Sequence, residues 1–117
     1  MKSSLDQLAV IATDEKLPWS EPWRGPIERL LSLLVKFGSR TNLVGDPSPE
    51  AVIGEHIVES LVVAAVVEEV FGGAPERAVD VGAGAGLETL ILALCWPQSR
   101  WVAVERRRRR AEFIEVA

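Results

Sequence analysis

Hydrophobic residues in the first part of the chain recur at the spacing of one face of a helix. The first such stretch predicts a short helix over residues 4–13, with Ser3 or Ser4 as its cap. A second helix is predicted to begin at Pro26, where a missing N–H is harmless, and to end at Gly38. Its apolar stripe consists of Ile27, Leu30, Leu31, Leu34 and Phe37.

A third helical pattern follows a turn that is rich in proline, glycine and polar residues. Ser48 stands at the position of a helix cap and Pro49 at the first helical position, so we expect the helix to begin there. Apolar residues continue at helical spacing to about Phe71, and the Gly-Gly-Ala-Pro segment 72–75 stops the helix. We expect residues 1–75 to form an N-terminal helical subdomain.

After residue 75 the pattern alternates between short β-type runs and helical runs. Residues 77–81 and 100–104 predict two strands, each followed by a helix, over 87–95 and from about Arg106 to the last residue. A β-α-β-α order implies parallel strands with a right-handed crossover. We therefore predict an α/β fold, with residues 76–117 as the first half of a Rossmann-like domain.

Composition narrows the compartment more than the function. The chain has 117 residues, is 48% hydrophobic and holds a single cysteine, Cys95, so an internal disulfide is excluded. The N-terminus lacks a signal-peptide pattern, and the longest apolar stretch, 61–67, is much shorter than a membrane span. We predict a cytoplasmic protein without membrane contact. A single histidine and a single cysteine also exclude most metal sites built from these two residue types, and no metal is expected.

The segment Val79-Asp80-Val81-Gly82-Ala83-Gly84-Ala85-Gly86 is the strongest chemical signal in the chain. A strand followed by a glycine turn and a helix forms a nucleotide-sized crevice at the carboxyl edge of an α/β sheet. A dinucleotide fingerprint would need a small residue at position 87, which is Leu87, so a nicotinamide-dependent oxidoreductase is disfavoured. The spacing instead resembles motif I of class I S-adenosylmethionine (SAM) methyltransferases.

Two acidic residues flank the turn in the predicted sheet. In the SAM interpretation, Asp80 contacts the amino-acid portion of the cofactor, although a structural role in the turn remains open. Glu105 ends the second strand, where a carboxylate can accept hydrogen bonds from both ribose hydroxyls. An acidic residue at this place can also be a simple surface charge.

Basic residues are unevenly distributed along the chain. The net charge is −4, yet five of the 13 lysines and arginines form the block Arg106–Arg110. Five successive cations cover every side of a helix, so some of them face the crevice or a neighbour. Contact with RNA phosphates and a solvated helix face both remain open for the arginine block. For the single histidine, His56, the pattern alone favours a surface or packed core position on the third helix over a functional role.

Several blocks together resemble the RsmG (GidB) family, SAM-dependent methyltransferases that modify guanine N7 in bacterial small-subunit (16S) ribosomal RNA. The resemblance covers roughly residues 26–116, and the combination of the second block with the glycine turn makes it specific. The blocks are Asn42-Leu43-Val44, His56-Ile57-Val58-Glu59-Ser60-Leu61, the segment 79–86, and Arg109-Arg110-Ala111-Glu112-Phe113-Ile114.

The resemblance implies SAM as cofactor and small-subunit ribosomal RNA as substrate. Glu105 stands where the family has aspartate, and Leu87-Glu88-Thr89 replaces the usual Phe-Pro-Gly, so Glu88 brings a carboxylate to the mouth of the site. The residues expected to bind the cofactor are Asp80, Gly82, Ala83, Gly84, Ala85, Gly86 and Glu105. Those expected to bind RNA are Arg106, Arg109 and Arg110.

Complete members of this family continue with further strands of the sheet. We therefore expect a truncated, split or decayed member, or one completed by a partner chain, with little activity of its own. A two-stranded parallel sheet leaves open edges and an uncovered apolar face, which predicts self-association. The alternative is a non-catalytic remnant that binds a nucleotide or only dimerises.

Overall fold

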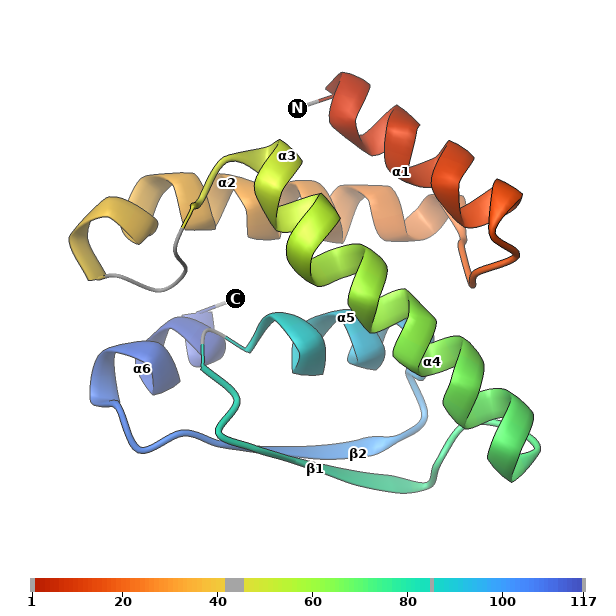
Figure 1. The fold of residues 1–117 in the computed structure, drawn as a ribbon. Helices are drawn as coiled ribbons and strands as arrows, with labels where there is room; N and C mark the ends of the chain where they lie inside the picture. The colour runs from red at the N-terminus through yellow and green to blue at the C-terminus, as the bar shows by residue number, and fades with distance from the viewer. Residues whose placement is uncertain (1, 42–45, 85, 117) are drawn as a thin grey trace.

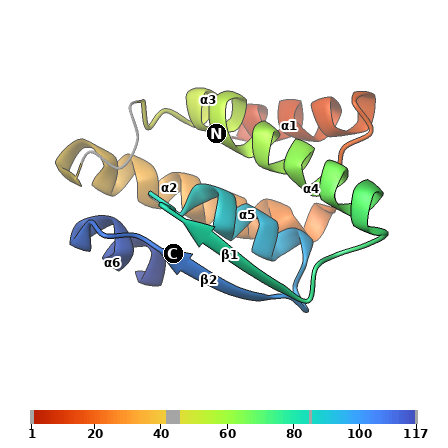
Figure 2. The ribbon, with the colours of Figure 1, turned by 60° about the horizontal axis from the view of Figure 1, so that its bottom comes forward.

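The computed structural model describes residues 2–41, 46–84 and 86–116 (Figures 1 and 2). Helices and a small parallel sheet make up an α/β structure in which α4 and α5 lie on one side of the two strands (Figure 1). The elements are α1 (Lys2–Asp14), a 3-10 turn (Glu21–Trp23), α2 (Arg24–Thr41), α3 (Pro49–Val52), a π-helical segment (Ile53–Ile57), α4 (Val58–Phe71), β1 (Arg77–Val81), α5 (Leu87–Cys95), β2 (Arg100–Val104) and α6 (Arg108–Val116).

The first two helices are longer than their sequence patterns predicted. α1 begins at Lys2, so the predicted cap at Ser3 or Ser4 is wrong. Ser4 is buried and donates a hydrogen bond of 3.0 Å to Glu50 Oε1, a partner that is distant in sequence. α2 begins at Arg24 rather than Pro26, since a proline within the first turn removes no intrahelical hydrogen bond. The helix also passes through Gly38, because one glycine costs a helix only about 1 kcal/mol.

The third predicted helix is one helical run with a wider turn inside it. Ser48 caps it as expected, accepting a hydrogen bond of 3.4 Å from the Ala51 N–H, and Pro49 is its first residue. The π-helical segment Ile53–Ile57 separates α3 from α4, which a sequence pattern with helical spacing did not predict. The run ends at Phe71, and Gly72 follows with a φ of 78°, in agreement with the predicted stop.

The sheet consists of β1 and β2 in parallel, with Arg77 opposite Arg100 and Val81 opposite Val104. Both strands have the predicted bounds, as does α5 between them. Alternate residues face α5 and are partly buried, whereas the opposite face is exposed. The exposed valines on that outer face are Val79, Val81, Val102 and Val104.

The main hydrophobic core joins the parts of the chain before and after residue 75. Leu8, Leu31 and Ile57 from the helical part are fully buried in one cluster with Ile91 of α5 and Phe113 of α6. The two predicted subdomains are therefore packed on a common core. None of the described helices has the length and apolar character needed to cross a membrane.

Candidate functional site

The glycine turn after β1 is fastened to the end of β2. The backbone N–H groups of Gly82 and Ala83 donate to the Val104 carbonyl at 2.7 and 3.0 Å. A further hydrogen bond lies within the turn, where the Gly86 N–H donates to the Ala83 carbonyl at 2.9 Å. The structure thus brings the turn to the carboxyl ends of both strands, as expected for the crevice of an α/β sheet.

Glu105 lies directly against this turn. Its Oε2 accepts a hydrogen bond of 2.6 Å from the Gly84 N–H, and its Oε1 accepts one of 3.0 Å from the Arg107 N–H. The Arg107 N–H is the main reason that the pKa of Glu105 is lowered, and the Gly84 N–H and the charges of Arg110 and Arg107 act in the same direction. The carboxylate therefore stays ionised and is already aligned with the turn.

Gly82 and Gly84 leave open space in front of the turn. Their φ angles are 70° and 63°, a backbone conformation that residues with side chains rarely adopt. A Cβ atom built at either position meets no atom within 4 Å. The missing side chains thus leave the backbone of the turn open at these two positions.

Gly86 is a glycine for a second reason. It is the N-cap of α5, has a φ of 78°, and its carbonyl accepts the Leu90 N–H at 2.8 Å. A Cβ atom at this position would lie 2.4 Å from Cγ1 of Ile114 in α6. The last helix therefore packs directly on the back of the turn, a contact that the glycine spacing alone did not reveal.

A hydrogen bond between side chains ties Asp80 to α5. The hydroxyl of Thr89 donates a hydrogen bond of 2.5 Å to Asp80 Oδ2. Sequence reasoning did not assign Thr89 a role. The available signal was its place in the first turn of the predicted helix, on the side that faces an inward residue of the preceding strand.

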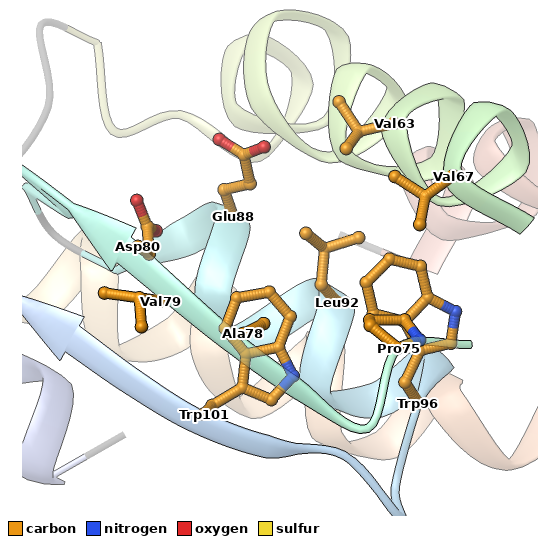
Figure 3. Close-up of a pocket in the computed structure, with 10 residues that line it drawn as sticks. All are labelled: Val63, Val67, Pro75, Ala78, Val79, Asp80, Glu88, Leu92, Trp96 and Trp101. Atoms are coloured by element: carbon orange, nitrogen blue, oxygen red, sulfur yellow. The ribbon is translucent and has the colours of Figure 1, made fainter. Parts of the chain in front are cut away.

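A hollow of about 220 Å³ lies beside β1 on the side of α4 (Figure 3). Asp80 and Glu88 form its polar end, and the carboxylates of both residues point into the same region (Figure 3). The pKa of Glu88 is raised, mainly by burial and further by the negative charges of Asp80 and Glu59. The other end is apolar, lined mainly by Val63, Val67, Pro75, Ala78, Leu92, Trp96 and Trp101.

His56 belongs to a smaller hollow of about 100 Å³, which it lines with Glu59, Ser60, Leu87 and Glu88. Glu88 is common to both hollows, so it lies between the histidine and Asp80. Within the part of the chain that the structure describes, no cluster of histidine, cysteine and carboxylate residues is arranged to hold a metal ion.

The arginine block straddles the start of the last helix. Arg106 and Arg107 are exposed and precede α6, whereas the predicted helix began near Arg106. Arg108 forms an ion pair of 3.0 Å with Glu112, and Arg110 is half-buried and close enough to influence Glu105. Ala85, Asn42-Leu43-Val44 and the side chain of Arg109, all named in the sequence analysis, lie outside the described residues.

Comparison with known proteins identifies relatives over most of the chain. The model of the GidB family, described as rRNA small subunit methyltransferase G, matches residues 25–117. A protein of Rhizorhabdus wittichii named ribosomal RNA small subunit methyltransferase G is 35% identical over 88 residues, covering 75% of this chain and 39% of the relative. A Leptothrix cholodnii protein of the same name is 30% identical over 114 residues, covering 97% of this chain and 52% of the relative.

A third relative with this name, from Myxococcus xanthus, is 37% identical over 94 residues and is matched over 41% of its length. No solved structure gives a significant match. The chain spans about half the length, or less, of these curated relatives. The matched region contains the glycine turn, Glu105 and the arginine block, and it extends over more than half of the chain, so the chain belongs to the GidB family, rRNA small subunit methyltransferase G.

Proposed function

We propose that this chain forms the cofactor-binding N-terminal portion of a SAM-dependent methyltransferase that modifies guanine N7 in small-subunit ribosomal RNA. The observation that carries the proposal is the hydrogen bond of 2.6 Å from the Gly84 N–H of the open glycine turn to Glu105 Oε2, in a chain of the GidB family. In this proposal residues 76–117 are the first half of a Rossmann-like domain, residues 1–75 are its helical subdomain, and the enzyme acts in the cytoplasm.

In this proposal, different residues around the turn contact different parts of the cofactor. The backbone of Gly82, Ala83, Gly84, Ala85 and Gly86 faces the methionine end of SAM, where the absence of side chains permits close approach. Glu105 accepts hydrogen bonds from the two ribose hydroxyls, since each carboxylate oxygen can accept more than one bond. Asp80 contacts the amino-acid portion.

The bound SAM supplies an already activated methyl group, so the protein contributes binding, orientation and exclusion of water rather than covalent catalysis. The hydrogen bonds that tie Gly82 and Ala83 to β2 keep the turn in one conformation before a ligand arrives. A preformed site avoids the entropy cost of ordering the loop on binding.

In this proposal the RNA substrate contacts the arginine block beside the cofactor site. Arg106, Arg109 and Arg110 are the residues we expect to meet phosphates, because they belong to the arginine block that begins immediately after Glu105. The outer face of the sheet is exposed, and in this proposal a further polypeptide covers it in the active enzyme. We expect the purified 117-residue chain alone to transfer little radiolabelled methyl group to small ribosomal subunits.

Calorimetry with SAM, S-adenosylhomocysteine and NAD tests the cofactor assignment. We expect binding of the two sulfur ligands and none of NAD. We expect Gly84→Val to abolish binding, because it places a branched side chain in the open space at a residue with a positive φ. The control is Val10→Ala, on the exposed side of α1, which should retain binding. Absence of SAM binding at millimolar ligand would refute the proposal.

The outer face of the sheet supports a second candidate function. Val79, Val81, Val102 and Val104 form a contiguous exposed apolar surface, as a non-catalytic module that associates through its sheet would present. Such a remnant self-associates and binds neither SAM nor S-adenosylhomocysteine. The same calorimetry therefore separates it from the enzyme.

A further inference from the structure

A hydrogen bond between side chains ties the end of β1 to the first turn of α5. The Thr89 hydroxyl, in a residue that is 5% exposed, donates to Asp80 Oδ2 at 2.5 Å. Asp80 itself is half-buried and lines the hollow in Figure 3. Oδ2 is therefore engaged by the protein, whereas no residue that the structure describes donates a hydrogen bond to Oδ1, which can accept one from a ligand.

We propose that Thr89 is a positioning residue for the cofactor: its hydroxyl fixes the Asp80 carboxylate so that Oδ1 meets the ammonium group of the amino-acid portion of SAM. The inference rests on the proposed function and assigns a task to a residue outside the glycine motif.

The charge around Asp80 explains why the carboxylate needs such a hold. Glu88 neighbours Thr89 in sequence and points its carboxylate toward the same region as Asp80 (Figure 3). Two like charges in a partly buried region repel, and this repulsion favours rotation of Asp80 away from Glu88. A short bond from a buried hydroxyl opposes that rotation, because Thr89 is β-branched and is held by the packing of α5.

The arrangement also selects the ligand group. A hydrogen bond from Thr89 leaves the negative charge of Asp80 in place, and Glu88 adds a second carboxylate nearby. A cationic ammonium group relieves the repulsion between the two, whereas a ligand without this group gains nothing from the fixed carboxylate. Thr89 should therefore matter for ligands that carry the amino-acid portion and for no others.

Calorimetry with two ligands tests this inference on the full chain. S-adenosylhomocysteine carries the amino-acid portion, and 5′-methylthioadenosine is the corresponding thioether without it. The variants are Thr89→Val, which keeps the shape and removes the donor, and Thr89→Ser, which keeps the donor. Thr13→Val is the matched control, because Thr13 is exposed on α1 and its hydroxyl bonds only the Ala9 carbonyl in the described structure.

We expect Thr89→Val to weaken S-adenosylhomocysteine binding about tenfold, the size of one hydrogen bond to a charged group, and to change 5′-methylthioadenosine binding by less than about twofold. Thr89→Ser and Thr13→Val should bind both ligands as the parent chain does. Should Thr89→Val fail to fold, Thr89→Ala gives the same test, since it also removes the hydroxyl donor and leaves the Asp80 carboxylate in place.

Equal losses for the two ligands, or no loss for either, overturn the positioning role and leave the SAM assignment standing. Weakened S-adenosylhomocysteine binding by Thr89→Ser overturns the positioning role as well, because the hydroxyl would then not be the relevant group. A parent chain that binds neither ligand at millimolar concentration overturns the proposed function, and the role of Thr89 with it.

Discussion

The helical core and the outer face of the sheet treat similar residues in opposite ways. Leu31 and Leu34 of α2 are 0% exposed, whereas Val79 and Val81 of β1 are 63% and 79% exposed. Both groups are apolar, so the difference lies in what covers them. The described helices bury one another and one side of α5, and they cover the face of the sheet that is turned toward α5 (Figure 1). The opposite face of the sheet is exposed. Stability therefore resides mainly in the helices, while the strand ends carry the candidate site.

The largest test of this contrast is a pair of alanine substitutions. Leu31→Ala should lower the free energy of unfolding by about 2–5 kcal/mol, because it leaves a cavity in a closed core. Val81→Ala, its matched control on the outer face, should change it by about 0.5 kcal/mol or less. Chemical denaturation measures both. A large loss for Val81→Ala would mean that the outer face is covered in solution.

A second pair compares two glycines of the same turn. Gly84→Ala should cost about 1–2 kcal/mol of unfolding free energy, the strain of a positive φ alone. Gly86→Ala should cost about 2–4 kcal/mol, because its Cβ also overlaps Ile114. Thermal unfolding measures the two losses.

The steric part of this prediction has its own check. Adding Ile114→Ala to Gly86→Ala should recover part of the loss, since neighbouring substitutions are not additive. The same addition to Gly84→Ala should only destabilise further. Equal losses at the two glycines would contradict the packing of α6 on the turn.

A third test asks whether the exposed valines associate. We expect the chain to self-associate in solution, and Val81→Lys to shift it toward the monomer, because a charge in an apolar contact is costly to bury. Val10→Lys, on the exposed side of α1, should leave association unchanged. Size-exclusion chromatography with light scattering reads both, and a monomeric parent chain would contradict the prediction.

The smallest expected effect concerns Glu105 and acid. Its pKa lies below the ordinary 4.5, so the bonds to Gly84 and Arg107 are fully stabilising above that value and are lost as pH falls through the folded-state pKa. The amide resonance of Gly84 in an NMR titration should therefore shift with a midpoint below pH 4.5. Glu105→Gln should abolish this step, and a transition at neutral pH would argue against the assignment.

The sequence predicted the bounds of helices and strands well where glycine and proline residues separate them. β1, α5 and β2 have the expected bounds, because glycine and proline residues mark each change between strand and helix. The neighbouring positions of Glu105 and the turn also followed from the parallel β-α-β order. Family membership, inferred from four short blocks, is confirmed by the family model over residues 25–117.

Contacts between distant segments were not predictable in the same way. Ser4 looked like a cap because serine often caps helices, but its hydroxyl is used by Glu50. The Asp80–Thr89 bond and the packing of Ile114 on Gly86 depend on how α5 and α6 are placed on the sheet. A periodic pattern gives the face of a helix, and it does not give the partner of that face.

The contact between Gly86 and Ile114 has a consequence for the order in which the protein is made. A ribosome releases the N-terminal segments first, so α1 to α4 and both strands emerge before the residues of α6. The back of the glycine turn acquires its packing partner only when Ile114 has left the exit tunnel. Translation thus postpones the final packing of the glycine turn until nearly every other element of this segment is available.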